Sequence, residues 1–237
     1  MTVVNEDLVI HEEGALVRVQ ISRPPGNLFT VEMCVRLTTL LTNPPEGAHV
    51  LRLSGSGGVF CRGRERPAES VEDLHAEVRA LLGLNEALVK TSLVTVAEVG
   101  GDAAGFGTGL AALCDVALVA SDAQLSFPEV TIDLAPSLVL AWLTPMVGRR
   151  NAFWLTATGR AISGDEAQAV GLVNQAFPAA ELSARVDDVV ATLLQYQPRV
   201  HREIKEMLRI FATLDADQSN TFARDRLVLG SLARRRT

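Results

Sequence analysis

The sequence predicts an α/β core followed by a largely helical C-terminal region. Three observations lead to this fold class. Strand-like and helix-like segments alternate in the first part of the chain, two glycine-rich segments each follow a strand-like run, and helical patterns dominate from Ser137 onward. The chain has 237 residues and is 48% hydrophobic, so it can bury one substantial core.

The first elements are predicted to be a β-hairpin, a helix and a strand. Glu13 and Gly14 separate two alternating runs, and Thr30 is a suitable N-cap for the amphipathic segment that follows it. In chain order, we expect strands over 8–13 and 15–22, a helix over 31–41 and a strand over 49–54.

The middle of the chain predicts a long helix and two buried strands. Ser70, with Asp73 three residues later, is typical of a helix start, and apolar spacing continues to about Lys90. Residues 94–99 and 116–120 are short β-branched runs, which are typical of strands buried on both faces.

The remainder of the chain is predicted to be mostly helical. Ser137, after a proline, is expected to cap a helix, and Ser163 with Glu166 matches a capping box. A brief strand is expected over 172–177, and Pro198 fits the first turn of a further helix.

Charge and cysteine content exclude several classes of protein. The 28 acidic and 22 basic residues give a net charge of -6, which argues against a protein that coats nucleic acid or an anionic membrane. Three scattered cysteines form no disulfide framework, and the N-terminus lacks the basic stretch of a signal peptide. A cytoplasmic location is therefore expected.

Common nucleotide and metal motifs are missing. Gly105, Gly107 and Gly109 do not have the spacing of the dinucleotide fingerprint, and neither glycine-rich segment continues into a phosphate-loop lysine. The four histidines stand singly, so no metal site is expected. By themselves the glycines are read most simply as tight turns, although each segment could also present backbone N–H groups to an anion.

Four segments, in order along the chain, resemble the crotonase (enoyl-CoA hydratase/isomerase) superfamily. They are VFCRGRE (59–65), VGGDAAGFGTGLAALCD (99–115), LSFPEV (125–130) and AISGDEAQAVGLVNQAFP (161–178). The resemblance implies a crotonase-like ββα spiral core with the active site over residues 1–180 and a helical trimerisation region over 181–237. It also implies a homotrimer or hexamer, and a substrate that is a thioester of coenzyme A or of an acyl carrier protein.

The resemblance also assigns candidate catalytic groups. Two backbone N–H groups, those of Arg64 and Phe106, are expected to hold the thioester oxygen as an enolate forms. Because only the backbone is used, the unusual side chains at these positions do not exclude the role. Glu129 falls at the position of a family catalytic glutamate and can move the proton α to the thioester. Without the resemblance, a glutamate that caps a loop or pairs with an arginine is the simpler interpretation.

One family acid is missing from the sequence. Hydratases of the family carry a second glutamate, and its position here is Gly109. Asp133 and Asp102 are tentative substitutes, although aspartates in loops commonly serve turns. With Glu129 alone, isomerisation of a double bond is slightly preferred over hydration.

Arg62, Arg64 and Arg66 concentrate positive charge where the family commonly has Ala, Ala and Leu. They are tentative partners for the phosphates of coenzyme A or of phosphopantetheine, and no other cofactor is expected. A solvated loop whose arginines neutralise Glu65 and Glu69 is the alternative. The arginines at 234–236 would either reach a neighbouring subunit's ligand or form a frayed terminus.

The alternative functions are a dehydratase or decarboxylase that acts on carrier-protein thioesters, and a catalytically silent crotonase-like subunit. The missing glutamate is compatible with both alternatives.

Overall fold

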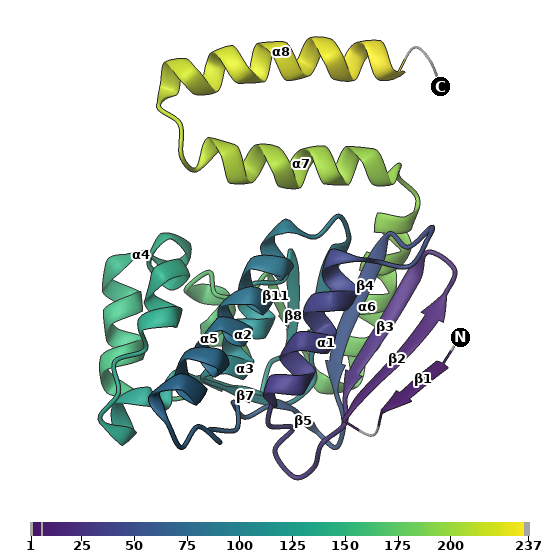
Figure 1. Cartoon of the computed structure of the whole chain (residues 1–237). Coiled ribbons are helices and arrows are strands. Elements are labelled where there is room, and N and C mark those ends of the chain that lie inside the picture. The colour runs from purple at the N-terminus through teal and green to yellow at the C-terminus, as the bar shows by residue number, and fades with distance from the viewer. Residues whose placement is uncertain (1, 6, 235–237) are drawn as a thin grey trace. The chain divides into compact units, whose positions relative to one another are not determined.

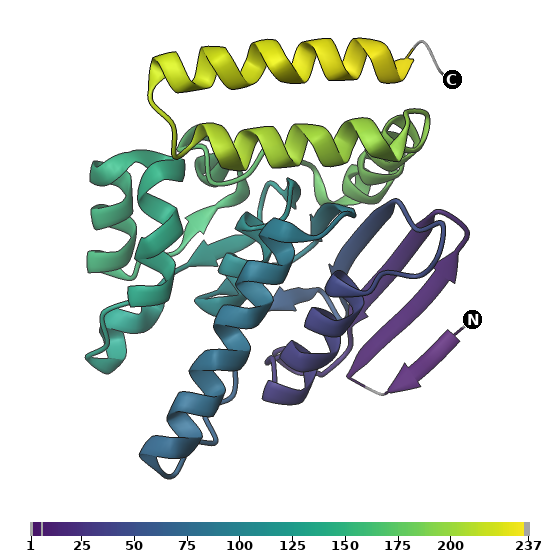
Figure 2. The ribbon, with the colours of Figure 1, turned by 45° about the horizontal axis from the view of Figure 1, so that its top comes forward.

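The computed structural model describes residues 2–5 and 7–234 (Figures 1 and 2). The chain forms two compact units, residues 1–198 and 199–237. The expected limit of the core, residue 180, lies inside helix α6 (Ala179–Leu194), which packs on the sheet of the first unit. The first compact unit therefore extends beyond that limit.

A seven-stranded sheet forms the centre of the first unit, in the order β1–β2–β3–β4–β6–β8–β11 among the described residues. Its strands are Thr2–Asn5, Leu8–Glu13, Leu16–Ile21, Val50–Gly55, Val94–Val99, Val116–Ala120 and Gln175–Phe177. The first three strands pair antiparallel, which confirms the predicted hairpin, and β3, β4, β6, β8 and β11 pair parallel.

The parallel part of this sheet is buried on both faces, as its uniform apolar runs predict. Leu51 and Leu53 of β4 and Val96 and Ala97 of β6 are all fully buried. Helix α6 contacts β4, β6, β8 and β11, and Figure 1 shows it behind the sheet, away from α1 and α2. The opposite side is therefore left to the helices and loops that form the cavity described below.

A second sheet of four short strands has the order β10–β9–β7–β5. Its strands are Ile162–Ser163, Gln124–Ser126, Asp102–Ala104 and Val59–Cys61. Helix α3 (Phe106–Ala112) contacts β6 and β8 of the large sheet and β5 and β7 of the small one. The small sheet thus places the two glycine-rich segments side by side, although they are about forty residues apart in sequence.

The other helices of the first unit begin largely where the sequence predicts. They are α1 (Val31–Thr42), α2 (Val71–Lys90), the 3-10 helix η1 (Pro128–Ile132), α4 (Ser137–Thr158) and α5 (Gly164–Ala169). Thr30, Ser70 and Ser163 each accept a hydrogen bond from the backbone N–H three residues later. These caps satisfy donors that the first turn of a helix leaves without partners.

One predicted cap is wrong. Ser137 is the first residue of α4, Pro136 occupies the N-cap position, and the Ser137 hydroxyl donates to the Ala135 carbonyl instead of accepting from the helix. Helix α4 is also interrupted at Gly148, whose φ of 76° is not helical.

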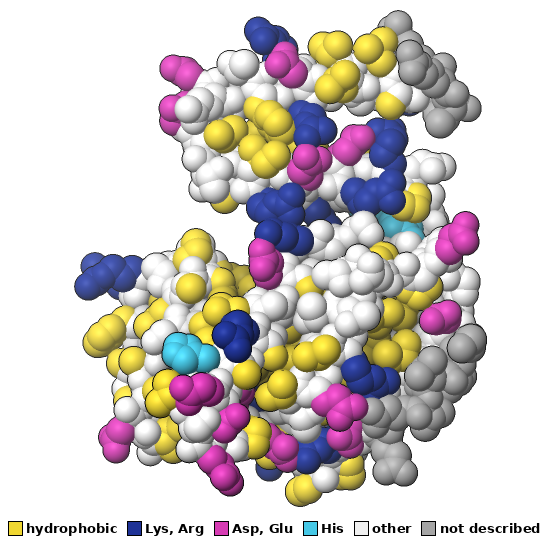
Figure 3. Space-filling model, in the orientation of Figure 1, with side chains coloured by type: hydrophobic (Ala, Val, Ile, Leu, Met, Phe, Trp, Pro, Cys, Tyr) yellow, Lys and Arg dark blue, Asp and Glu magenta, His cyan; other side chains and the backbone are white. Residues whose placement is uncertain are grey.

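The second unit consists of two helices, α7 (Pro198–Phe211) and α8 (Ala216–Arg234). Pro198 opens α7, as predicted. Phe211 and Phe222 pack edge to face with ring centroids 5.8 Å apart, and Arg226 pairs with Glu206 at 2.6 Å. Hydrophobic side chains remain exposed on this unit (Figure 3), including Leu227, Val228, Leu229 and Leu232 of α8. Of the arginine tail, 235 and 236 lie outside the described residues.

None of the described helices is long and apolar enough to cross a membrane.

Candidate functional site

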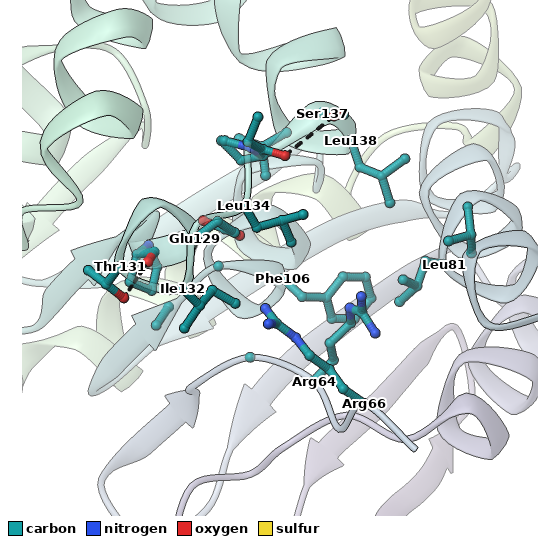
Figure 4. A pocket seen from close by; sticks show the side chains of 18 of the residues that line it. Arg64, Arg66, Leu81, Phe106, Glu129, Thr131, Ile132, Leu134, Ser137 and Leu138 are labelled. Atoms are coloured by element: carbon teal, nitrogen blue, oxygen red, sulfur yellow. Dashed lines mark hydrogen bonds between the residues drawn. The ribbon is translucent and has the colours of Figure 1, made fainter. Parts of the chain in front are cut away.

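A cavity with a volume of about 540 Å³ lies where the two glycine-rich segments meet α2, η1 and the start of α4 (Figure 4). Its lining residues are Arg62, Gly63, Arg64, Arg66, Leu74, Val78, Leu81, Ala104, Gly105, Phe106, Pro128, Glu129, Thr131, Ile132, Leu134, Ala135, Pro136, Ser137, Leu138 and Val139. The cavity therefore brings together Arg64, Phe106 and Glu129, which the sequence assigns to one site.

The backbone around Arg64 leaves its N–H free on one edge of an extended segment. The Phe29 N–H donates to the Gly63 carbonyl at 3.0 Å, and the Glu65 N–H donates to the Phe29 carbonyl at 2.9 Å. Successive N–H groups of an extended segment point to opposite edges, so the N–H of Arg64 points away from Phe29. Gly63 has a φ of +124°, a conformation that favours glycine.

The N–H of Phe106 is free because Phe106 is the first residue of α3. Its N-cap, Gly105, has a φ of 52° and a ψ of -115° and supplies no side-chain cap. The first backbone donors of a helix have no acceptor within the helix. A Cβ atom on Gly107 would lie 1.9 Å from the Cys61 carbonyl oxygen, so this helix start packs directly against the strand that leads to Arg64.

Glu129 lies in η1, with its carboxyl group beside Gly105. A Cβ atom on Gly105 would lie 2.9 Å from Glu129 Oε1, so the absence of a side chain there makes room for the carboxyl group. Oε2 is buried and has no hydrogen-bond partner among the described residues. Burial raises the pKa of Glu129 above its usual range, and the charges of Arg66 and Arg64 offset part of that increase.

Such a carboxyl group is suited to proton transfer. It has one oxygen without a hydrogen-bond partner among the described residues, and its raised pKa makes it a stronger base once it is ionised.

Glu129 is the single carboxyl group among the described residues that line the cavity. The two tentative substitutes lie elsewhere. Asp133 is exposed and occupies a left-handed conformation at the end of η1, with a φ of 56°. Asp102 accepts from the Gln124 N–H at 3.1 Å and from Arg62 at 2.8 Å. Both aspartates have the turn and pairing roles that loop aspartates commonly have.

The position of the missing family glutamate is filled by a neighbour. A Cβ atom on Gly109 would lie 3.3 Å from the ring of Trp142 of α4. The Trp142 ring packs edge to face on Phe127, with centroids 6.0 Å apart. A longer side chain at 109 would therefore have to displace Trp142.

The three arginines all line the cavity but differ in their partners. Arg62 pairs with Asp102, and Arg64 pairs with Glu77 of α2. Arg66 forms no ion pair with the described residues. Glu65 pairs with Arg23, so the part of the sequence-based alternative in which these arginines neutralise Glu65 is wrong.

Glu77 is a residue that the sequence reasoning missed. Its side chain is only 4% exposed and its partner Arg64 is 18% exposed, so the pair lies in the protein interior. The spacing of apolar residues around Glu77 could have identified it. Glu77 is three residues after Leu74 and four before Leu81, so it lies on the apolar face of its own helix. A charged residue on such a face calls for a buried partner.

No cluster of three metal-ligating side chains occurs in the part of the chain that the structure describes.

The fold and the sequence resemble those of known proteins. A crystallised enoyl-CoA hydratase-like protein of Thermobifida fusca YX, in complex with CoA, is 28% identical, with a TM-score of 0.85 over 97% of this chain and 95% of that one. An enoyl-CoA hydratase-like protein of Thermus thermophilus is 30% identical over 206 residues, which is 83% of this chain and 81% of the relative. A peroxisomal Delta(3,5)-Delta(2,4)-dienoyl-CoA isomerase of Arabidopsis thaliana is 28% identical over 70% of this chain and 64% of its own length.

Two glycine-rich segments on parallel strands and one half-buried carboxyl group meet at this cavity, an arrangement that fits a crotonase-type enzyme. The family model for enoyl-CoA hydratase/isomerase matches residues 11–234. The chain belongs to the enoyl-CoA hydratase/isomerase family.

Proposed function

We propose that the protein binds an acyl-CoA thioester with its carbonyl oxygen between the N–H groups of Arg64 and Phe106. Neither donor has a backbone partner among the described residues and both residues line one cavity, which supports this placement. Negative charge builds up on that oxygen when the α proton leaves. Loss of one such donor costs about 3 kcal/mol of transition-state stabilisation.

The reaction that we propose is migration of a double bond. Glu129 takes a proton from C2 of a 3-enoyl thioester, which gives a dienolate held by the two N–H groups, and returns the proton to C4. The double bond moves from C3–C4 to C2–C3, and the carboxylate is regenerated. One carboxyl group is enough for both transfers.

The observation that carries this choice is that Glu129 is the single carboxyl group along the described cavity wall. Hydration needs one group to activate water and another to deliver the α proton, and the place for a second glutamate is taken up by the contact between Gly109 and Trp142. A mechanism with one acid and base fits these residues better.

The coenzyme A portion is proposed to pass Arg62, which is half exposed and lines the same cavity. A guanidinium group there can pair with a phosphate of coenzyme A or of a carrier-protein pantetheine. The assay described below therefore includes carrier-protein thioesters as alternative substrates. We propose no cofactor other than this part of the substrate.

Self-association as a trimer or hexamer is also proposed. It is supported by the exposed apolar residues of α8, since Leu227 is 72% and Leu229 is 60% exposed. Light scattering of the intact protein tests this proposal directly.

The test of the reaction is an assay with 3-enoyl-CoA, 2-enoyl-CoA and their carrier-protein equivalents. We expect conversion of 3-enoyl-CoA to 2-enoyl-CoA without net addition of water. The Glu129→Gln variant should lower kcat by at least about a hundredfold, because general-base catalysis is worth that much or more. Glu181→Gln, which removes an exposed carboxyl group of α6, is the matched control.

The pH profile gives a second readout of the same group. Burial raises the pKa of Glu129, so protonation stops catalysis at a higher pH than for an exposed glutamate. The kcat/KM value should therefore fall as the pH drops through that raised pKa. Hydration of 2-enoyl-CoA as the main reaction, or equal activity of Glu129→Gln and wild type, would contradict the proposal.

A further inference from the structure

One arginine on the cavity wall has no ion-pair partner among the described residues. Of the three arginines on its wall, Arg62 is paired with Asp102 and Arg64 with Glu77, whereas Arg66 has no ion pair among the described residues. The neighbouring wall is apolar and includes Leu74, Val78, Leu81, Ile132 and Leu134. An arginine of this kind is suited to an anion that the ligand brings.

The position of Arg66 along its segment places it on the side of the acyl part of a bound thioester. The three arginines alternate along one segment, with the carbonyl-binding N–H of Arg64 in the middle. On one side, Arg62 is held by Asp102 of β7. On the other side, Figure 4 shows Arg64 and Arg66 beside Phe106, across the cavity from Glu129, Ile132 and Leu134.

Arg66 is also electrostatically coupled to the base. After burial, which raises the pKa of Glu129, the charge of Arg66 lowers that pKa, and so does the charge of Arg64. A base that abstracts the α proton must lie next to the acyl chain, so a charge that acts on this base lies near the acyl chain as well.

We infer that the preferred substrate is a thioester whose acyl chain carries a second carboxylate, and that this carboxylate pairs with Arg66. The inference rests on the proposed function, because the direction of the thioester is taken from the amide pair and Glu129. A purely hydrocarbon acyl chain would offer the guanidinium group no partner. A carboxylate accepts two parallel N–H bonds from the same group.

The test compares two five-carbon thioesters that differ only at the end of the acyl chain. Binding of glutaryl-CoA and pentanoyl-CoA is measured by titration calorimetry on the intact protein, so that no turnover is needed. We expect glutaryl-CoA to bind about tenfold more tightly, as is typical of one charge-assisted pair.

Three variants assign the preference to one side chain. Arg66→Gln should remove the tenfold preference and leave pentanoyl-CoA binding within about twofold, and Arg66→Lys should retain part of it. Arg62→Gln is the matched comparison. It should weaken both thioesters equally if it binds the coenzyme A portion. Because Arg66 is exposed, its replacement should not unfold the chain, which a thermal melt verifies.

The outcomes separate this inference from the proposed function. Equal binding of the two thioesters by wild type overturns the inference, as does equal weakening of both by Arg66→Gln, since Arg66 would then bind the part that they share. A glutaryl preference that Arg66→Gln removes supports the inference even if no thioester is turned over. In that case it is the proposed reaction that fails.

Discussion

The two backbone segments that supply the candidate N–H groups are held in place by different means. The segment of Arg64 is an extended edge, anchored by a bridge to Phe29 and by the ion pair between its own side chain and Glu77. The segment of Phe106 is anchored by close backbone packing, with Gly107 against Cys61 and Gly105 against Glu129. The first segment should therefore depend on its ion pair, and the second on the absence of side chains at its two glycines.

The strongest way to break the second segment is Gly107→Ala. Its methyl group would lie 1.9 Å from the Cys61 carbonyl oxygen, and two backbone segments would have to separate to admit it. We expect a destabilisation of about 3 kcal/mol, the upper end for overpacking, and loss of activity. Urea unfolding measures the destabilisation.

Gly83→Ala in α2 is the matched control, because nothing lies within 4 Å of its Cβ position. It should leave stability unchanged or raise it by up to about 1 kcal/mol, since alanine favours a helix over glycine. Similar destabilisation by both variants would show that close packing is not what holds the segment.

Gly105→Ala should separate stability from catalysis. Its Cβ atom would lie 2.9 Å from Glu129 Oε1, which is the flexible end of a side chain and can move away. The φ of 52° and ψ of -115° lie outside the regions that residues with a side chain favour, which adds strain of about 1–3 kcal/mol. A displacement of the Glu129 carboxyl group by about 1 Å should lower kcat by about a hundredfold. A rate assay beside a thermal melt checks this, and unchanged kcat would place the base elsewhere.

The first segment is tested by Glu77→Gln. This change leaves the Arg64 guanidinium without its buried charged partner, which should cost about 2 kcal/mol of stability. We expect kcat to fall by about tenfold with KM nearly unchanged, because the N–H of Arg64 is positioned less well. The double variant Arg64→Gln/Glu77→Gln should cost less than the sum of the two single changes. Additive costs would mean that the pair does not position the segment.

The smallest expected effect is that of Asp133→Asn. Asp133 is exposed and does not line the cavity, so its carboxyl group has no part in the proposed proton transfer. Enoyl-CoA isomerisation should stay within about twofold of wild type, as for other surface changes. A larger loss would return Asp133 to the list of candidate acids.

Local signals in the sequence predicted most of the larger elements. Thr30, Ser70 and Ser163 begin helices where their spacing indicates, because a cap depends on only three or four neighbouring residues. The strands β5, β7, β9 and β10 were missed. Each has only two or three residues, and each is formed by pairing with a strand distant in sequence.

The candidate site likewise contains residues that the sequence predicted and residues that it did not. The resemblance in VFCRGRE, the glycine-rich segment and FPEV was sufficient to predict that Arg64, Phe106 and Glu129 lie together, and all three line one cavity. It was not sufficient for Asp133, which is exposed and does not line the cavity, or for Glu77, whose partner lies thirteen residues earlier in a different element.

The sequence by itself determined the class of fold, the helix starts and the two glycine-rich segments, because these depend on periodicity and on residues close together in the chain. Only the tertiary structure decided which charges in the cavity are already paired. Arg62, Arg64 and Arg66 look equivalent along the chain, yet β7 and α2 each bring one acid within reach of an arginine, and Arg66 has no ion pair among the described residues. The pairing of a charge depends on what the folded chain places beside it, and this was not readable from the local sequence.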